Sequence, residues 1–215
     1  MLRIYDYAPS GNCYEVRLLL SLLGREYERV PVDIFAGDTL TDEFERLNPA
    51  RETPVLALDG GHVLLQSNAI LWYLGIGTDY LPTDPLAQAM VVQWLLIEQS
   101  RVVSTIGAAR FFALTGRSPE QVEGRIRDGR RALDLLDGAL RRGGFLVAER
   151  PSIADVSVYA YTRKAPDFGI ELAEWPSVAS WIRRMESLPG FIEDYVPYPE
   201  NARPGVSRSI YDEAA

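Results

Sequence analysis

The feature that most constrains the fold is a change of hydrophobic periodicity near residue 76 of the 215-residue chain. Before it, strand-like runs alternate with helix-like segments in the order βαβα and then ββα, which predicts a small mixed sheet covered by helices. After a Gly- and Pro-containing linker the pattern is helical only. We therefore predict an α/β domain at residues 1–76, an all-helical domain at residues 86–190 and an irregular tail at residues 191–215, either disordered or packed as a strap.

Local signals place the elements of the first domain. Residues 2–7 read as a strand, and residues 13–23 as a helix that Gly24 ends. Residues 27–33 alternate in polarity and contain Pro31, which places this strand at a sheet edge. The remaining segments are a short helix at residues 42–47, a hairpin at residues 54–65 and a helix at residues 67–74 with Ser67 as its N-cap.

The second half carries helical patterns separated by turn residues. A long apolar-striped segment covers residues 86–114, and the next helix, residues 119–141, follows Ser118 as a predicted cap. Ser152 and Asp155 match a capping box that opens a helix to about residue 164. The last helix covers residues 176–187 and stops at a Pro-Gly pair.

Composition excludes several classes of function. A formal net charge of −8 argues against nucleic acid and anionic membranes as main partners. Cys13 and His62 are the only cysteine and histidine, so neither a Cys/His zinc site nor an intrachain disulfide is possible. No apolar run approaches the roughly 18 residues of a membrane span, and no targeting segment is evident. We therefore expect a cytoplasmic protein.

The loop and helix start at residues 8–13 form the first candidate site. A strand, a polar loop and a helix start in this order leave free N–H groups and the positive end of a helix dipole near Ser10 and Cys13. Such a position favours an anion, including a thiolate. Taken alone, however, this stretch is better explained by Ser10 acting only as a helix cap.

Further stretches add a family resemblance. They are Ser10-Gly-Asn-Cys-Tyr-Glu-Val-Arg-Leu-Leu-Leu20, Asn48-Pro49 followed by Glu52-Thr-Pro-Val-Leu56, Gln66-Ser-Asn-Ala-Ile70 followed by Tyr73-Leu74, and Ser152-Ile-Ala-Asp155. In this order, ahead of a helical second half, residues 1–190 resemble the cytosolic glutathione S-transferases. The first stretch is similar to the serine-type classes and to bacterial classes that use an Asn two residues later. The resemblance implies a thioredoxin-like N-terminal domain (βαβαββα) followed by an all-α domain that carries the electrophile site and the dimer contacts.

The resemblance also implies a binding site for glutathione as co-substrate, without a metal. Gln66 and Ser67 would hold the γ-glutamyl group, and a hydroxyl with N–H groups at a helix start suits its carboxylate. Thr53, before a cis-Pro54, would pair with the cysteinyl backbone. Arg51 is the cation nearest the place where the family meets the glycyl carboxylate, although Glu52 follows it and Gln66 stands where many members have Glu.

The thiol of glutathione would then face Ser10. One hydrogen bond donated to a charged group contributes about 1.5–3 kcal/mol, which lowers a thiol pKa by roughly 1–2 units. Asn12 is a second candidate for this contact. Cys13 is either a reactive thiol or a buried core residue, and we favour the core. Tyr5 and Tyr7 are further candidates for the contact with sulfur, because other classes of the family use a tyrosine near the end of the first strand.

The predicted function is transfer of the glutathione thiolate to a small electrophile by a homodimeric enzyme. The alternatives are a glutathione-dependent peroxidase or disulfide reductase, and a non-enzymatic glutathione-binding protein. We expect the electrophile between the two domains, near the Tyr7–Pro9 loop and near Arg101, Arg110, Phe111 and Phe112.

Overall fold

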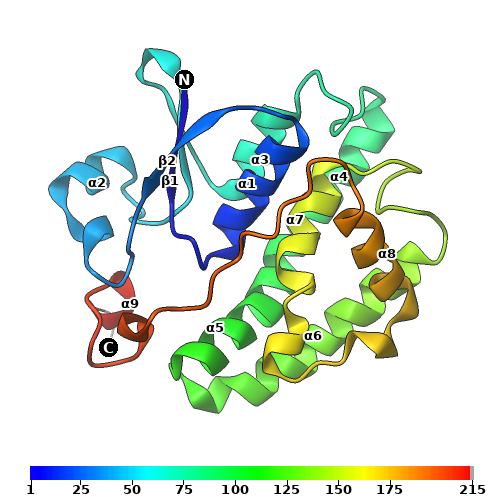
Figure 1. Cartoon of the computed structure of the whole chain (residues 1–215). Helices are drawn as coiled ribbons and strands as arrows, with labels where there is room; N and C mark the ends of the chain where they lie inside the picture. The colour runs from blue at the N-terminus through cyan, green and yellow to red at the C-terminus, as the bar shows by residue number, and fades with distance from the viewer. Residues whose placement is uncertain (214–215) are drawn as a thin grey trace.

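The computed structural model describes residues 1–213, and its first domain is a four-stranded mixed sheet with helices packed on it (Figure 1). The order of strands is β2-β1-β3-β4, with β1 parallel to β2 and antiparallel to β3, and with β3 antiparallel to β4. The elements are β1 Leu2–Asp6, α1 Gly11–Leu22, β2 Tyr27–Pro31, α2 Asp42–Leu47, β3 Val55–Ala57, β4 Val63–Leu65 and α3 Ser67–Gly75. This arrangement confirms the predicted thioredoxin-like α/β fold, with Pro31 on an edge strand.

One predicted helix cap in this domain is wrong. Ser67 is the first helical residue of α3, and the N-cap is Gln66, whose backbone has φ 66° and ψ 117°. Periodicity alone does not show a non-Gly residue in this conformation, which L residues rarely adopt. The cap at Ser10 is confirmed, since its Oγ accepts a hydrogen bond from the Cys13 N–H at 3.3 Å.

The second domain is helical, as predicted. Its elements are α4 Pro85–Ile97, a π-helical segment Glu98–Gly107, α5 Ala108–Thr115, α6 Pro119–Leu140, α7 Ile153–Thr162 and α8 Pro176–Glu186. The long segment predicted at residues 86–114 therefore widens into a π-helix in its middle. Ser118 makes no capping hydrogen bond, because its backbone is left-handed with φ 41°, so that predicted cap is wrong.

Helix α7 joins the two domains into one core. Every residue of α7 is buried, and the helix packs against α1 of the first domain. The predicted capping box at its start is present: the Asp155 carboxylate accepts hydrogen bonds from the Ser152 N–H at 2.9 Å, the Leu146 N–H at 2.9 Å and the Trp181 indole N–H at 3.0 Å. A buried carboxylate with this many donors fixes the direction in which α7 leaves its loop.

The tail is a packed strap up to residue 213. It runs from α8 back to the first domain, as the orange-to-red ribbon in Figure 1 shows, and ends in the short helix α9 Ile210–Glu213. Tyr14 Oη donates to the Ile192 carbonyl at 2.8 Å, and the Arg208 N–H donates to the Phe35 carbonyl at 2.8 Å. Within residues 1–213, none of the helices is both long and apolar enough to cross a membrane.

Candidate functional site

A cavity of about 480 Å³ lies where the two domains and the tail meet. The first domain contributes Tyr7, Ser10, Asn12, Ile34, Thr39, Asn48, Arg51, Glu52, Thr53, Pro54, Gln66 and Ser67; the helical domain contributes Gln99, Val103, Ser104, Gly107, Ala108, Phe111, Arg125 and Tyr161; and the tail contributes Tyr198, Ile210 and Tyr211. The seven site residues named from the sequence all line it, namely Ser10, Asn12, Arg51, Thr53, Pro54, Gln66 and Ser67.

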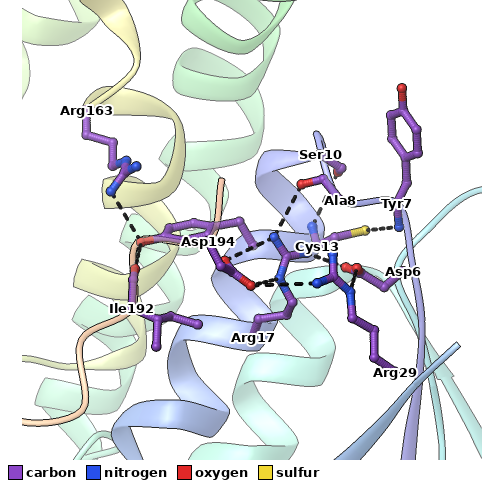
Figure 2. Close-up of polar contacts among 11 residues, drawn as sticks. Asp6, Tyr7, Ala8, Ser10, Cys13, Arg17, Arg29, Arg163, Ile192 and Asp194 are labelled. Carbon is purple, nitrogen blue, oxygen red and sulfur yellow. Dashed lines mark hydrogen bonds and ion pairs between the residues drawn. The ribbon is translucent and has the colours of Figure 1, made fainter. Parts of the chain in front are cut away.

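Ser10 is the N-cap of α1, and its side chain lines the cavity. Its Oγ accepts from the Cys13 N–H, so the hydroxyl group can still donate. The Ser10 N–H donates to the Tyr7 carbonyl at 2.9 Å, which closes the loop before the helix. Arg17 binds the Ala8 carbonyl of the same loop at 3.3 Å (Figure 2). The loop that presents Ser10 is thus fixed from both sides.

Cys13 is a buried thiol and not a reactive one. Its side chain has no exposed surface, and its sulfur accepts a hydrogen bond from the Tyr7 N–H at 3.4 Å. Burial raises the pKa of this thiol to about 12, so it stays protonated near neutral pH. The preferred interpretation of Cys13 as a core residue is confirmed.

Asn12 and Tyr7 bring polar atoms without partners to the cavity. Asn12 Oδ1 and Tyr7 Oη are both buried and make no hydrogen bond within residues 1–213. Burial also raises the pKa of Tyr7, which therefore remains a neutral phenol. Tyr5 packs edge-on against Phe44 and does not line the cavity. Of the two candidate tyrosines, only Tyr7 lines the cavity.

Near the start of α3 lie two buried acids, Glu15 and Glu98, that the sequence analysis did not identify. Ser67 is only 3 % exposed, and Glu15 on α1 and Glu98 beyond α4 have no exposed surface. Burial and their mutual repulsion raise the pKa of Glu15 well above its usual range, and burial raises the pKa of Glu98 to about 7. Asn68 Nδ2 donates to Glu98 Oε2 at 3.0 Å. At neutral pH the pair therefore holds at least one proton below the start of α3.

The loop before β3 is held by Asn48, a lining residue that the sequence motif includes but to which no role was assigned. Asn48 Nδ2 donates to the Glu52 carbonyl at 2.8 Å, and its Oδ1 accepts from the Ala50 N–H at 3.0 Å. The Thr53–Pro54 peptide bond that follows is cis, as the resemblance implied. Arg51, at the cavity, is ion-paired with Glu45 at 3.0 Å.

The electrophile side was predicted only in part. Phe111 lines the cavity, with Tyr211 at 5.1 Å and Tyr198 at 5.8 Å between ring centroids. Arg101 and Phe112 are not among the lining residues. Neither is Arg110, which is 2 % exposed, donates to Asp167 at 2.8 Å and lies under the rings of Tyr195 and Tyr198. The prediction that Arg110 binds an anionic substrate is therefore wrong, because this buried side chain binds Asp167 and packs against the tail.

Tyr161, Arg125 and the tail residues were missed for a common reason. They reach the cavity through packing between segments that lie far apart in the chain, and no local motif marks them. Within residues 1–213, no group of three or more His, Cys, Asp or Glu side chains is placed to hold a metal ion.

The chain matches two family models and several known proteins over most of its length. Residues 9–75 match the model of the glutathione S-transferase N-terminal domain, and residues 102–189 match that of the C-terminal domain. The chain is 30 % identical to maleylacetoacetate isomerase of Rhizobium meliloti, over 94 % of this chain and 97 % of that protein. It is 28 % identical to disulfide-bond oxidoreductase YfcG of Escherichia coli, over 88 % and 92 %. A crystal structure of a glutathione transferase homolog from Lodderomyces elongisporus, with two glutathione molecules per subunit, matches with a TM-score of 0.81 at 25 % identity, over 88 % and 94 %.

Proposed function

Because the chain belongs to the glutathione S-transferase family, we propose that it is a transferase that adds the thiolate of glutathione to a small electrophile. The observation that carries the proposal is the meeting of three separate segments in one cavity: the start of α1 with Ser10, the loop with cis Thr53–Pro54, and the start of α3 with Gln66 and Ser67. These are the groups that a tripeptide with two carboxylates and a thiol requires.

Each part of glutathione has a proposed partner. The γ-glutamyl carboxylate binds at the start of α3, where Ser67 offers its hydroxyl and helix N–H groups. The cysteinyl backbone pairs with Thr53, and Arg51 attracts the glycyl carboxylate. The sulfur faces Ser10 and Asn12 at the start of α1. Ser10 donates a hydrogen bond to the thiolate, which lowers the pKa of the thiol by about 1–2 units. The thiolate then forms the S–C bond; in a substitution the leaving group departs with its electron pair, and in an addition the π pair shifts to the acceptor group of the electrophile, which takes up a proton from water.

Two relatives favour further candidates at the same site. The isomerase of R. meliloti favours glutathione-dependent isomerisation, and YfcG favours disulfide reduction. Burial of Cys13 argues against an exchange through that thiol, so a reductase here would use glutathione alone with Ser10 and Asn12. The pattern Ser10-Gly11-Asn12 supports membership of a bacterial, serine-type or Asn-containing class. A non-enzymatic glutathione-binding protein is the remaining alternative, and a cytoplasmic location stays a prediction.

We further propose that the chain forms a homodimer through α3 and α4. Large apolar side chains are exposed on these helices: Tyr73 at 44 %, Leu86 at 71 %, Val92 at 40 % and Leu96 at 65 %. An exposed apolar group of this kind favours a protein contact. Sedimentation velocity of the wild type and of Leu96→Glu measures the assembly.

Calorimetric titration with reduced glutathione tests the proposed function. We expect binding that Ser67→Ala weakens, while Ser10→Ala leaves affinity nearly unchanged and raises the pKa of the bound thiol. His62→Ala, an exposed site in the hairpin, is the control. Tighter binding of the oxidised, disulfide-linked dimer of glutathione would shift the assignment to the reductase. No heat with either ligand would contradict a glutathione site altogether.

A further inference from the structure

Tyr161 on α7 occupies a space that two glycines from two other elements leave open. Its ring lies between the first turn of α1 and the end of the π-helical segment, and the residue is 8 % exposed. A Cβ atom at Gly11 would lie 2.5 Å from the Tyr161 ring, and one at Gly107 would lie 3.1 Å from it. A Cβ atom at Gly11 would require the ring to move, and one at Gly107 would require it to shift by a few tenths of an ångström, so both glycines make room for the phenol.

The hydroxyl of Tyr161 lies at the same helix end as Ser10. It accepts a hydrogen bond from the Asn12 N–H at 3.3 Å. That N–H belongs to the first turn of α1, where backbone donors have no acceptor within the helix. A phenol oxygen that accepts a bond keeps its own proton to donate, and within residues 1–213 no acceptor takes that proton. The donor is therefore available to a ligand in the cavity.

Tyr161 remains protonated under ordinary conditions. Burial raises the pKa of its hydroxyl well above the usual range, and the nearby Tyr195, Tyr198, Glu15 and Glu98 add to this shift. The group consequently acts as a hydrogen-bond donor and does not take up a proton from the thiol. The Asn12 N–H polarises the phenol and strengthens the bond that it donates.

From this geometry we infer that Tyr161 is a catalytic residue that donates a hydrogen bond to the glutathione thiolate and shares this task with Ser10. The inference rests on the proposed function. The thiol S–H bond breaks with its proton passing to solvent water, the electron pair stays on sulfur, and Tyr161 keeps its own proton. The helical domain thereby adds a donor to the sulfur, whose other proposed partners, Ser10 and Asn12, belong to the first domain.

Tyr161→Phe tests the inference because it keeps the ring and removes only the hydroxyl. The pKa of bound glutathione is measured from the ultraviolet absorbance of the thiolate as the pH is raised. We expect the variant to raise this pKa by about 1–2 units. At pH values below the pKa of the thiol in the wild type, kcat/KM of the variant should be at least tenfold lower than that of the wild type. At high pH, where the thiol is ionised in both proteins, the two values should approach each other.

Tyr159→Phe is the matched control. It lies on the same helix with no exposed surface, but its hydroxyl donates to Glu186 at 3.2 Å and lies outside the cavity. Gly107→Ala is a second variant, since it displaces the ring with the hydroxyl still present, and it should shift the thiol pKa in the same direction. Circular dichroism checks that each variant is folded.

A thiol pKa in Tyr161→Phe equal to that of the control, beside a clear shift in Ser10→Ala, would overturn the inference and leave the proposed function intact. A fall in kcat/KM of the same size at every pH would also overturn it, because a structural defect alone gives that result. Absence of any thiolate signal in the wild type would instead contradict the proposed function.

Discussion

Replacing Arg17 with Met should destabilise the protein strongly, because this guanidinium joins three segments inside the core. The side chains of Arg17 and Asp6 have no exposed surface and form an ion pair. Arg17 Nε also donates to Asp194 of the tail at 2.8 Å, as Figure 2 shows. Met fills much of the same space but satisfies none of these acceptors, so Arg17→Met isolates the loss of the charge and its hydrogen bonds.

The magnitude follows from what remains around Asp6. Removing one partner of a buried ion pair costs about 3–5 kcal/mol when the other charge is left unpaired. Here Asp6 keeps its ion pair with Arg29, whose side chain is 37 % exposed and therefore well screened. We accordingly expect the lower end, a loss of about 3 kcal/mol in the free energy of unfolding. Arg29→Met should cost about 1 kcal/mol, because that side chain is more exposed.

Urea unfolding at a fixed protomer concentration measures both losses. The double variant Asp6→Asn/Arg17→Met should lose less free energy of unfolding than the sum of the losses in Asp6→Asn and Arg17→Met. In the double variant, neither the Asp6 nor the Arg17 charge remains buried without the other. A loss for Arg17→Met below about 1 kcal/mol, or one equal to that of Arg29→Met, would refute the reasoning from burial.

Two pH-dependent predictions concern Glu98 and Asp212, two acids whose pKa values are shifted. Burial raises the pKa of Glu98 from 4.5 to about 7, so the free energy of unfolding should fall as the pH rises between these values; Glu98→Gln should flatten this slope in urea titrations, and an unchanged slope would contradict the assignment. Burial acts to raise the pKa of Asp212, but hydrogen bonds from Ser209, Ser207 and Arg117 outweigh it and hold that pKa at about 2. The stabilisation by Asp212 should therefore be present above about pH 4 and be lost toward pH 2. At neutral pH, Asp212→Asn should raise KM for the electrophile through a loosened α9 while leaving glutathione affinity unchanged, and steady-state kinetics decide this.

The parts of the site that the sequence predicts are those built from local order. Ser10 follows a strand and a loop and precedes a helix, so its place at a helix end is set by a dozen neighbouring residues. The cap at α3 is the exception, since Gln66 takes φ 66° in a conformation that residue type does not indicate. The cis bond at Pro54 came from the resemblance alone, because few X–Pro bonds are cis.

Long-range packing accounts for the parts that were missed. Tyr161 reads as one more apolar position of a buried helix, and only its packing beside Gly11 and Gly107 and its hydrogen bond from the Asn12 N–H place it at the site. Arg110 looks like a free cation beside aromatic residues until Asp167 and the tail are placed around it. The π-helical widening after Ile97 shifts side chains on one helix face without changing the apolar pattern that predicts a helix.

The packed tail also has a consequence for the order in which the protein is made. Tyr198, Ile210 and Tyr211 line one wall of the cavity, whereas Phe111, which packs against both tyrosine rings, is synthesised far earlier. Domains generally fold as units, N-terminal first, as the chain leaves the ribosome. The lining residues of the first domain are thus synthesised early, whereas this wall is absent until the segment carrying the tail residues has emerged. Under the proposed function, the residues assigned to glutathione in the first domain leave the ribosome before the tail residues that line the other side of the cavity.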